Sequence, residues 1–297
     1  MFGKKSAKND ANGDLQDIGL RIASICGRYF LKSEHLHYGY WPSEMAVELQ
    51  NLPKAQQLYA EFLKARIPAS VKSILDVGCG TGHNASLLLD YGFAVDCVSP
   101  SDALSCATRD SLAGRGRLFQ STFEALDIDR KYDCILFSES FQYIDLKSAF
   151  ENMSKFLNPG GMVLIADFFR IPADGTSPLS GGHRLNKFKE ALAGSEFVAV
   201  SEEDITDFTA PNLQLVDEAL QQVALPSRDL ILDTLQRRYP WSYAFMRFWA
   251  RLLFNQKLLK MEYKYFSGER NADNFKKFKR YLVYVLKRKS EASSVVQ

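Results

Sequence analysis

The fold of this chain is decided by the stretch Ser73-Ile-Leu-Asp-Val-Gly-Cys-Gly-Thr-Gly-His-Asn84. An apolar strand runs into three glycines at every second position, and an amphipathic segment follows. Gly78, Gly80 and Gly82 allow a sharp turn and let a ligand lie against bare main chain. Asp76 stands at the carboxyl end of the strand, where α/β folds bind their ligands. The stretch therefore predicts a strand–turn–helix unit with a ligand site.

A glycine-rich turn after a strand occurs in several nucleotide-binding folds, so the details matter. A phosphate-binding loop needs Lys and then Ser or Thr after its last glycine, whereas His83 and Asn84 stand there. A dinucleotide fingerprint spaces its glycines two and then three apart, whereas these lie two and two apart. The run 76–82 resembles the first motif of the class I S-adenosylmethionine-dependent methyltransferases. The alternative is a structural turn in some other α/β domain.

Length and composition set broad limits. A chain of 297 residues can hold one large domain or a core with an added subdomain. The five cysteines form no Cys-x-x-Cys pair and no metal spacing, which favours reduced thiols in a cytoplasmic protein. Residues 1–14 lack the apolar core of a signal peptide, and no apolar run is long enough to span a bilayer.

The small net charge of +2 conceals a basic C-terminal region. Residues 236–290 contain 15 Lys or Arg against 3 Asp or Glu, so the rest of the chain is acidic. Such a region suits an anionic substrate, a carrier protein or a lipid surface. The alternative is a solvated face that pairs with the acidic body.

The central part of the chain alternates strands with helices. Strands are predicted over 73–77, 93–98, 117–119, 132–138 and 162–168, with helices over 82–91, 101–112 and 146–157 and a turn over 158–161. This alternation predicts a parallel sheet covered on both faces. The near-continuous apolar run 162–166 is typical of a strand buried on both sides.

The flanking segments are less regular. On the N-terminal side we predict helices over 15–32 and 43–67. After the core we predict a loop over 171–183, a helix over 184–193 and a strand over 197–200. A helix through 219–223 is expected to end before Pro226, followed by an aromatic helical segment over 228–266 and a last strand over 278–286. The resemblance implies a doubly wound α/β fold with a mostly parallel seven-stranded sheet, N-terminal helices, and an antiparallel last strand preceded by a helical insertion that forms a lid. The expected units are tails at 1–14 and 291–297, a helical cap at 15–70, a cofactor-binding core at 71–170, its remainder with a substrate loop at 171–227, the lid at 228–266 and the last strand region at 267–290.

The resemblance implies S-adenosylmethionine as the cofactor and S-adenosylhomocysteine as the product. Asp76 and the glycine turn would hold the amino acid and ribose. The family usually ends its second strand with an acid for the ribose, but Ser99 stands there, so Ser101 or Asp102 could substitute. A serine makes only neutral hydrogen bonds, and Ser99 could instead be a turn residue before Pro100.

Other cofactor contacts are also carried over from the family. Thr122 and the main chain of Phe123 match the adenine contact, with a plain surface loop as the alternative. Phe137 and Ser138 end the fourth strand beside the cofactor. The aromatic loop 35–41 contains Tyr38 and Trp41, whose rings would cover a sulfonium and exclude water. Ordinary packing of a terminal helix is the alternative.

The region after the fourth strand supplies the catalytic candidates. Residues 137–144 resemble the substrate loop of the tocopherol, sterol and cyclopropane-fatty-acid C-methyltransferases. Glu139 matches a family glutamate and is a candidate general base, or else a residue that positions the ligand. Tyr143 stands where some members have a histidine, and His183 lies in the expected substrate loop. No metal site is expected, because no third ligand accompanies His35 and His37.

We therefore expect an enzyme that moves a methyl group in line to a small, apolar or lipid-like acceptor, or to one on an acyl carrier. The alternatives are aminopropyl transfer, or cofactor binding without catalysis, in the same fold. A nucleic-acid partner is not expected, because the Asn-Pro-Pro-Tyr type of motif is absent after the fourth strand. Contact with a membrane surface or an acyl carrier through the basic region is an open possibility, and so is the oligomeric state.

Overall fold

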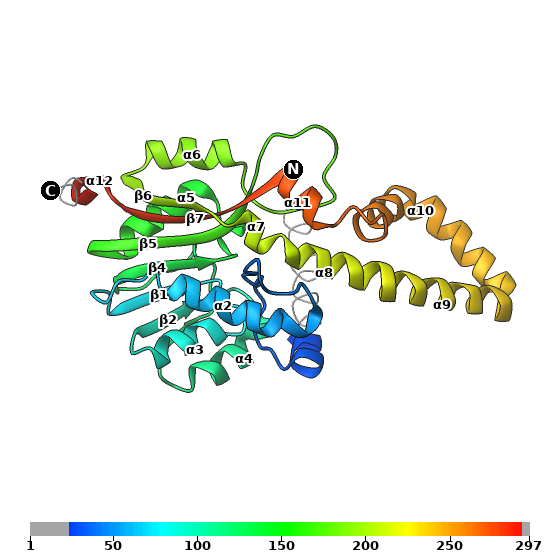
Figure 1. Ribbon diagram of the computed structural model, residues 1–297, viewed down its shortest axis with the longest axis horizontal. Coiled ribbons are helices and arrows are strands. Elements are labelled where there is room, and N and C mark those ends of the chain that lie inside the picture. Colours follow the sequence, from blue (N-terminus) through cyan, green and yellow to red (C-terminus); the bar gives the residue numbers. More distant parts are fainter. Residues whose placement is uncertain (1–23, 293–297) are drawn as a thin grey trace.

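The computed structural model describes residues 24–292, whose centre is one seven-stranded sheet (Figure 1). Its strands are β1 (Ser73–Val77), β2 (Ala94–Val98), β3 (Leu118–Phe119), β4 (Tyr132–Ser138), β5 (Leu157–Arg170), β6 (Phe197–Asp204) and β7 (Lys279–Arg288). Their order across the sheet is β3-β2-β1-β4-β5-β7-β6. Neighbouring strands are parallel except that β7 runs antiparallel to both β5 and β6. The predicted fold class is confirmed, including the antiparallel last strand.

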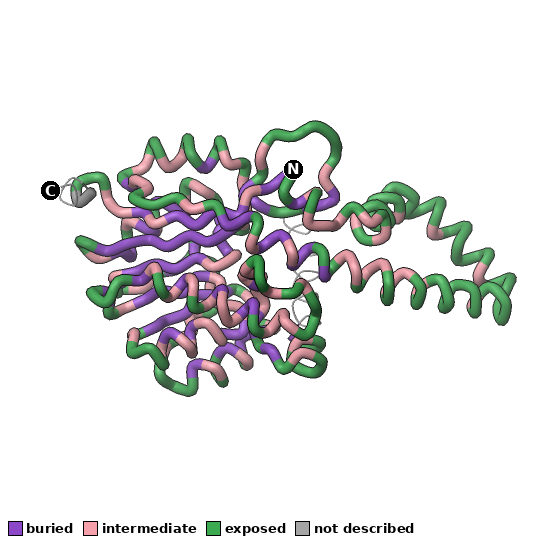
Figure 2. The backbone as a smooth tube through the Cα atoms, viewed as in Figure 1, coloured by how far each residue is buried: buried purple, intermediate pink, exposed green. Residues whose placement is uncertain are grey.

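Helices cover both faces of this sheet. The covering helices include α2 (Leu52–Lys64), α3 (His83–Asp90), α4 (Asp102–Leu112), α5 (Leu146–Phe156) and α6 (Leu185–Gly194). Later in the chain come α7 (Thr206–Thr209), α8 (Pro211–Ala219), α9 (Leu225–Arg238), α10 (Pro240–Phe266), α11 (Ala272–Phe278) and α12 (Lys289–Ala292). One core cluster joins the sheet to α5 and α6, and a second joins it to α2, α3 and α4. Figure 2 shows the buried strands between these helices. Each buried Leu or Phe contributes about 1.5–3 kcal/mol by leaving water.

The ends of the core helices follow from local chemistry. Pro53 stands in the first turn of α2, where the missing N–H removes no helical bond. The Asp145 side chain accepts a hydrogen bond from the Ser148 N–H and caps α5. Gly82 has a φ of +77° directly before α3, so the glycine turn also starts that helix.

Three predicted elements are wrong in extent. The helix predicted over 43–67 is shorter, Leu52–Lys64, because a turn stands at 43–44 and a separate 3₁₀ helix, Leu49–Asn51, precedes it. The predicted turn 158–161 lies inside β5 as a bulge: Leu157 pairs with Tyr132, whereas Met162 pairs with Cys134. The helix expected to end before Pro226 continues into α9, because a π-helical turn precedes it and the proline falls in the first turn of α9.

The N-terminal prediction is tested only in part. Residues 1–23 and 293–297 lie outside the described part of the chain; these include the predicted tail 1–14, most of the tail predicted over 291–297 and half of the helix predicted over 15–32. Its remainder contains a π-helical turn, Gly27–Leu31. All five cysteines are unpaired thiols, which agrees with the absence of a disulfide framework.

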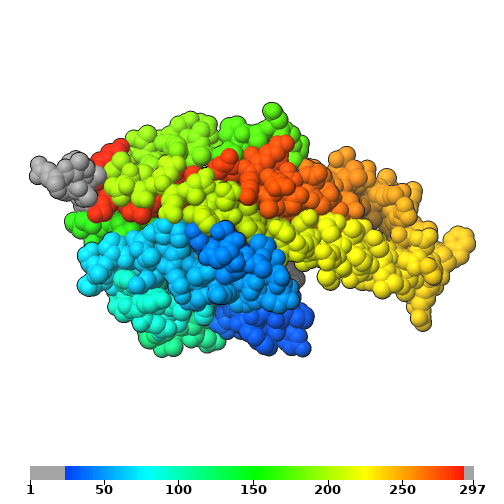
Figure 3. All heavy atoms as spheres, in the orientation of Figure 1, coloured from blue at the N-terminus to red at the C-terminus, as the bar shows by residue number. Residues whose placement is uncertain are grey.

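Helices α9 and α10 form a hairpin that extends away from the sheet and its covering helices (Figures 1 and 3). The insertion predicted at 228–266 lies within this hairpin. Neither helix contains a buried residue. The Arg228 guanidinium joins the two helices through an ion pair with Glu262 at 2.8 Å.

Candidate active site

The three glycines of the turn after β1 have different roles. All three adopt left-handed backbone, with φ of +77°, +58° and +77° at Gly78, Gly80 and Gly82. A Cβ at Gly78 would lie 2.3 Å from the Cβ of Ser140, and one at Gly82 would lie 3.0 Å from the Thr108 Cγ2. A Cβ at Gly80 would meet only Leu36, at 3.7 Å. Packing therefore requires two of the glycines, and the middle one leaves its main chain open to a ligand.

Asp76 lies directly before this turn and is buried. Its Oδ2 atom is buried without a hydrogen-bond partner among residues 24–292. Desolvation raises the pKa of this carboxyl to about 7. A buried polar atom without a partner is rare in native proteins and is satisfied by a ligand that donates a hydrogen bond. The carboxylate and the open Gly80 thus fit the ammonium and main chain of an amino acid ligand.

The end of β2 is organised by Ser99. This serine is buried, and its Oγ accepts a hydrogen bond from the Ser101 N–H at 3.3 Å. Asp102 begins α4, and its carboxylate accepts a hydrogen bond from the Gln120 side chain at 2.8 Å. The nearby Asp96 carboxylate is bound by Arg130 and Tyr132, each at 2.8 Å. Ser99 thus fulfils the turn role considered for it, and its single neutral side chain remains the candidate ribose contact.

The remaining predicted cofactor residues fall into two groups. Thr122 is exposed, and its hydroxyl accepts a hydrogen bond from the Ala125 N–H at 3.2 Å. Phe123 and Phe137 are core residues whose rings pack edge to face at 5.3 Å. The Phe123 carbonyl also accepts a hydrogen bond from Asn152. Any contact of these two phenylalanines with a cofactor would therefore involve the main chain.

The aromatic loop 35–41 lies over the glycine turn. Leu36 is the side chain nearest Gly80, and the Thr81 hydroxyl donates a hydrogen bond to the Glu34 carbonyl at 2.8 Å. Asn212 on α8 bonds both the N–H and the carbonyl of Gly39, each at 2.8 Å. Tertiary contacts from two sides thus fix the loop above the turn.

Two residues of this loop were candidates for cofactor binding, and they occupy different surroundings. Tyr38 stacks on Phe168 with ring centroids 6.3 Å apart, and its main-chain N–H donates to Glu139. Trp41 is buried in a small cluster with Ala55 and Leu215. Tyr38 therefore lies beside Glu139, the candidate catalytic base, whereas Trp41 packs between α2 and α8.

Glu139 follows β4 in left-handed backbone, with a φ of +58°. Such backbone costs energy in a non-glycine residue and is concentrated at functional sites. The Oε1 atom accepts hydrogen bonds from the Tyr38 N–H at 2.8 Å and the Tyr281 hydroxyl at 3.0 Å. Desolvation raises the pKa of this carboxyl to about 8, although both hydrogen bonds oppose the shift. A carboxyl with this pKa is mostly protonated at pH 7, and its deprotonated form can accept a proton as the pH approaches 8.

A chain of hydroxyl groups supports Glu139. Tyr281 on β7 contacts the Tyr59 hydroxyl at 2.7 Å, and Tyr59 on α2 contacts the Ser138 Oγ at 3.2 Å. Sequence reasoning missed both tyrosines. Alternation in β7 indicated that Tyr281 would face one side of the sheet, but nothing in the sequence pairs it with a residue 142 positions earlier.

Asp167 at the end of β5 is a second buried carboxyl near Glu139. Its oxygens accept from the Gln142 N–H at 2.9 Å and from the Gln142 side chain at 3.1 Å. Desolvation raises its pKa to about 7. Gln142 in turn accepts from the Gly182 N–H at 3.0 Å, and Lys279 donates to the Ser180 carbonyl at 3.0 Å. These contacts fix the predicted substrate loop 171–183 against the site.

The other two catalytic candidates lie apart from the Glu139 hydrogen bonds. Tyr143 exposes 62% of its surface. The His183 Nε2 contacts the Phe141 carbonyl at 3.1 Å, and its ring packs against Phe141. Within residues 24–292, no group of three or more His, Cys, Asp or Glu is placed to hold a metal ion.

Known proteins share both sequence and fold with this chain. Residues 49–193 match the family model described as a methyltransferase domain. The ubiquinone biosynthesis O-methyltransferase of Rickettsia conorii (strain ATCC VR-613 / Malish 7) is 33% identical over 117 residues, which are 38% of this chain and 40% of that protein. The chain thus spans less than half the length of this curated relative.

Two solved structures resemble the whole fold. The [4+2]-cyclase SpnF is 16% identical with a TM-score of 0.65, covering 93% of this chain and 94% of that chain. The geranyl diphosphate C-methyltransferase of Streptomyces coelicolor A3(2), solved with Mg²⁺, geranyl diphosphate and S-adenosyl-L-homocysteine, is 17% identical with a TM-score of 0.58, covering 91% and 97%. These identities establish a shared fold and leave the reaction to be argued from the site.

Proposed function

We propose that this chain is a class I S-adenosylmethionine-dependent methyltransferase and that it transfers a methyl group to a small, apolar or lipid-like acceptor. S-adenosylmethionine is the cofactor of this family. The observation that carries the proposal is the unpartnered Asp76 Oδ2 beside the open main chain of Gly80. Together they provide an anionic acceptor and a bare backbone surface for the zwitterionic end of that cofactor.

The bound cofactor would supply an already activated methyl group, so the chain's main tasks are alignment and exclusion of water. Asp76 and Gly80 would hold the amino acid end, and Ser99 at the end of β2 would contact the ribose. The loop 35–41 would cover the cofactor, because Leu36 and Tyr38 already lie over the turn and Glu139.

Glu139 would remove a proton from the acceptor as the new bond forms. Both of its hydrogen bonds are made by Oε1, and within residues 24–292 no group donates to Oε2. The carboxylate is therefore held in place by one oxygen and can accept the proton with the other. Its pKa of about 8 makes this transfer feasible near neutral pH.

The acceptor class follows from the side chains around Glu139. Tyr38 stacks on Phe168, and both rings pack against Phe275. These aromatic surfaces favour an acceptor with an apolar body and one ionisable group, such as a phenolic hydroxyl or an acidic carbon. The acceptor's ionisable proton would lie toward Glu139.

The test compares arginine substitutions at two glycines that both have left-handed backbone. Gly80→Arg places a side chain over the ligand surface, whereas Gly114→Arg falls at a φ of +75° with nothing within 4 Å of the new Cβ. Calorimetric titration with S-adenosylmethionine should show binding to wild type and to Gly114→Arg, and none to Gly80→Arg. Equal affinity in both variants would contradict the proposed site.

The reaction is tested with cofactor labelled in the methyl group and a panel of lipophilic phenols and β-dicarbonyl compounds. With the wild-type protein, we expect the labelled methyl group to appear in a product. Glu139→Gln should lower turnover at least tenfold while cofactor affinity changes less than threefold, because a general base contributes about 10²–10⁴-fold. Loss of product and of cofactor binding in equal measure would instead give Glu139 a positioning role.

A further inference from the structure

The hairpin α9–α10 exposes an unusual amount of apolar surface. Along one side of α10, the side chains of Trp241, Phe245, Phe248, Leu252 and Leu259 expose 88%, 65%, 61%, 62% and 57% of their surface. Their spacing of four, three, four and seven residues places them on one face of the helix. Contiguous exposed apolar surface of this kind marks a binding site.

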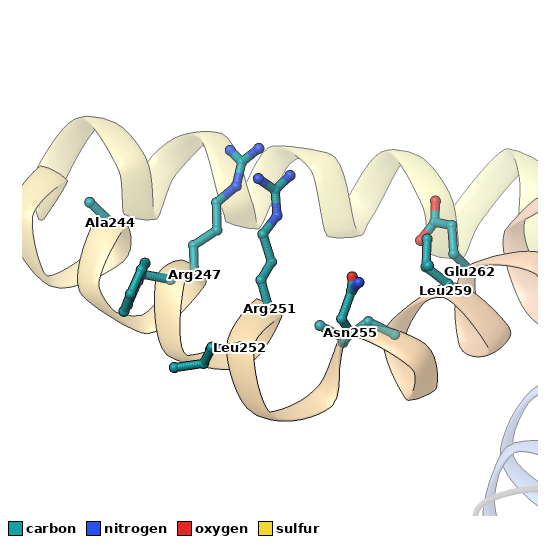
Figure 4. Close-up of a pocket in the computed structure, with 9 residues that line it drawn as sticks. Ala244, Arg247, Arg251, Leu252, Asn255, Leu259 and Glu262 are labelled. Atoms are coloured by element: carbon teal, nitrogen blue, oxygen red, sulfur yellow. The ribbon is translucent and has the colours of Figure 1, made fainter.

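Apolar side chains of α10 on the opposite side serve a different purpose. Leu258 is partly buried there. Phe266, seven residues after Leu259, instead continues the apolar stripe, and its ring centroid lies 4.4 Å from the guanidinium carbon of Arg228 on α9. Figure 4 shows Arg247 and Arg251 extending toward α9 and Leu252 directed away from it. These residues line a depression of about 880 Å³ on the hairpin. Three residues of the stripe, Phe248, Leu252 and Leu259, also line this depression, and α9 leaves them exposed.

Cations flank this face. Helix α10 carries Arg247, Arg251, Lys257, Lys260 and Lys264 and a single acid, Glu262. Glu262 is neutralised by Arg228 of α9. None of the five cations forms an ion pair within the described part of the chain. Helix α10 therefore combines an exposed apolar stripe with positive charge that no ion pair in the described residues neutralises.

We propose that the α9–α10 hairpin docks on an anionic lipid surface, with the aromatic stripe in the interface and the cations at the phosphates. An apolar face rich in Trp, Phe and Leu with Lys and Arg beside it is the composition of helices that lie in the membrane plane. A helix of 27 residues offers about 40 Å of such surface. None of the helices in residues 24–292 meets the length and apolarity required to cross a bilayer, so the hairpin would lie on it.

Two other binding partners would explain fewer features of this face. An acidic carrier protein would use the cations but leave Trp241 and Phe248 without a role. A second copy in a twofold arrangement would bring the same five cations together, because each copy presents an identical patch. An anionic lipid surface complements both features at once.

The hairpin also connects to the proposed site. The Tyr263 hydroxyl donates a hydrogen bond to the Thr176 carbonyl at 2.7 Å in the loop 171–183. At the other end, α8 leads into α9 and holds the loop 35–41 through Asn212. Docking would therefore place the site near the lipid surface, from which an apolar acceptor could arrive.

The experiment measures binding of the full chain to vesicles by co-sedimentation, without cofactor or acceptor. We expect binding to phosphatidylglycerol vesicles, weakened by salt, and much weaker binding to phosphatidylcholine vesicles. Because no reaction is measured, the result is independent of the proposed methyl transfer. Absence of binding to phosphatidylglycerol, or equal binding to both lipids, would overturn the proposal.

Two sets of substitutions separate the contributions. Lys257→Gln with Lys260→Gln should weaken binding about 25-fold, since each cation near such a surface contributes about fivefold. Trp241→Gln, Phe248→Gln and Leu252→Gln together should remove the binding that persists in high salt. The control, Lys147→Gln with Lys187→Gln, changes exposed lysines on α5 and α6 and should leave binding unchanged.

Sedimentation velocity on the same proteins tests the rival occupants. We expect the wild type and the polar triple variant to have the same oligomeric state. A wild-type dimer that the triple variant dissociates, together with no vesicle binding, would assign the face to a second copy. Unchanged vesicle binding in both hairpin variants would likewise refute docking through this surface.

Discussion

The hydrogen bond between Tyr281 and Glu139 controls how easily this carboxyl loses its proton. The hydroxyl donates to Oε1 at 3.0 Å and favours the charged form. Tyr281→Phe removes that donor and leaves the Tyr38 N–H in place. A hydrogen bond to a charged group contributes about 1.5–3 kcal/mol. Since one pKa unit corresponds to 1.36 kcal/mol, the pKa of Glu139 should rise by about one to two units.

The assay is ¹³C NMR of protein labelled at the glutamate carboxyl, titrated between pH 5 and pH 10 and assigned with Glu139→Gln. It requires neither cofactor nor acceptor. Wild type should titrate at about 8. Tyr59→Phe is the control, because it removes the contact with Tyr281 but keeps both hydrogen bonds to Glu139, so its titration should move much less.

Two results would refute this reasoning. A wild-type carboxyl that titrates near 4 would show that desolvation does not govern Glu139. An unchanged titration in Tyr281→Phe would show that the hydroxyl does not stabilise the carboxylate. If Glu139 is the base, the activity of the wild type should rise with pH through about 8 and level off above it, since only the deprotonated form accepts a proton.

Two further predictions concern the cofactor side of the site. Asp76→Asn should lower the affinity for S-adenosylmethionine at least tenfold at pH 8, because the ligand's ammonium group loses its anionic partner. In wild type, calorimetry should show affinity rising as the pH increases through about 7, where Asp76 loses its proton, and this dependence should vanish in the variant; a pH-independent wild type would contradict it. Asn212→Ala leaves the Gly39 N–H and carbonyl without their partner and should lower the free energy of unfolding by about 1–3 kcal/mol, as measured in urea. Hydrogen exchange should increase in the loop 35–41 of this variant, whereas an unchanged loop would show that Asn212 does not hold it.

The local sequence contained enough information for the alternating core. The run 73–84 predicted strand, turn and helix, because its apolar residues and glycines act over neighbouring positions. Errors arose where distant contacts override local signals. The Asn-Pro-Gly-Gly run 158–161 forms a bulge because β4 pairs on both sides of it, and Pro226 lies inside a helical segment because a π-helical turn precedes it.

The sequence by itself determined the strand–turn–helix unit, the carboxylate at its tip and the aromatic, basic character of the C-terminal insertion, since each depends on residues close together in the chain. Only the tertiary structure decided which glycine remains open, because Ser140 and Thr108 reach Gly78 and Gly82 from other elements. It alone brought Tyr59 and Tyr281, from α2 and β7, to Ser138 and Glu139 at the end of β4. The protonation of the Glu139 carboxyl is set by its burial and by hydrogen bonds from distant segments of the chain. Neither can be predicted from the residues next to it in the sequence.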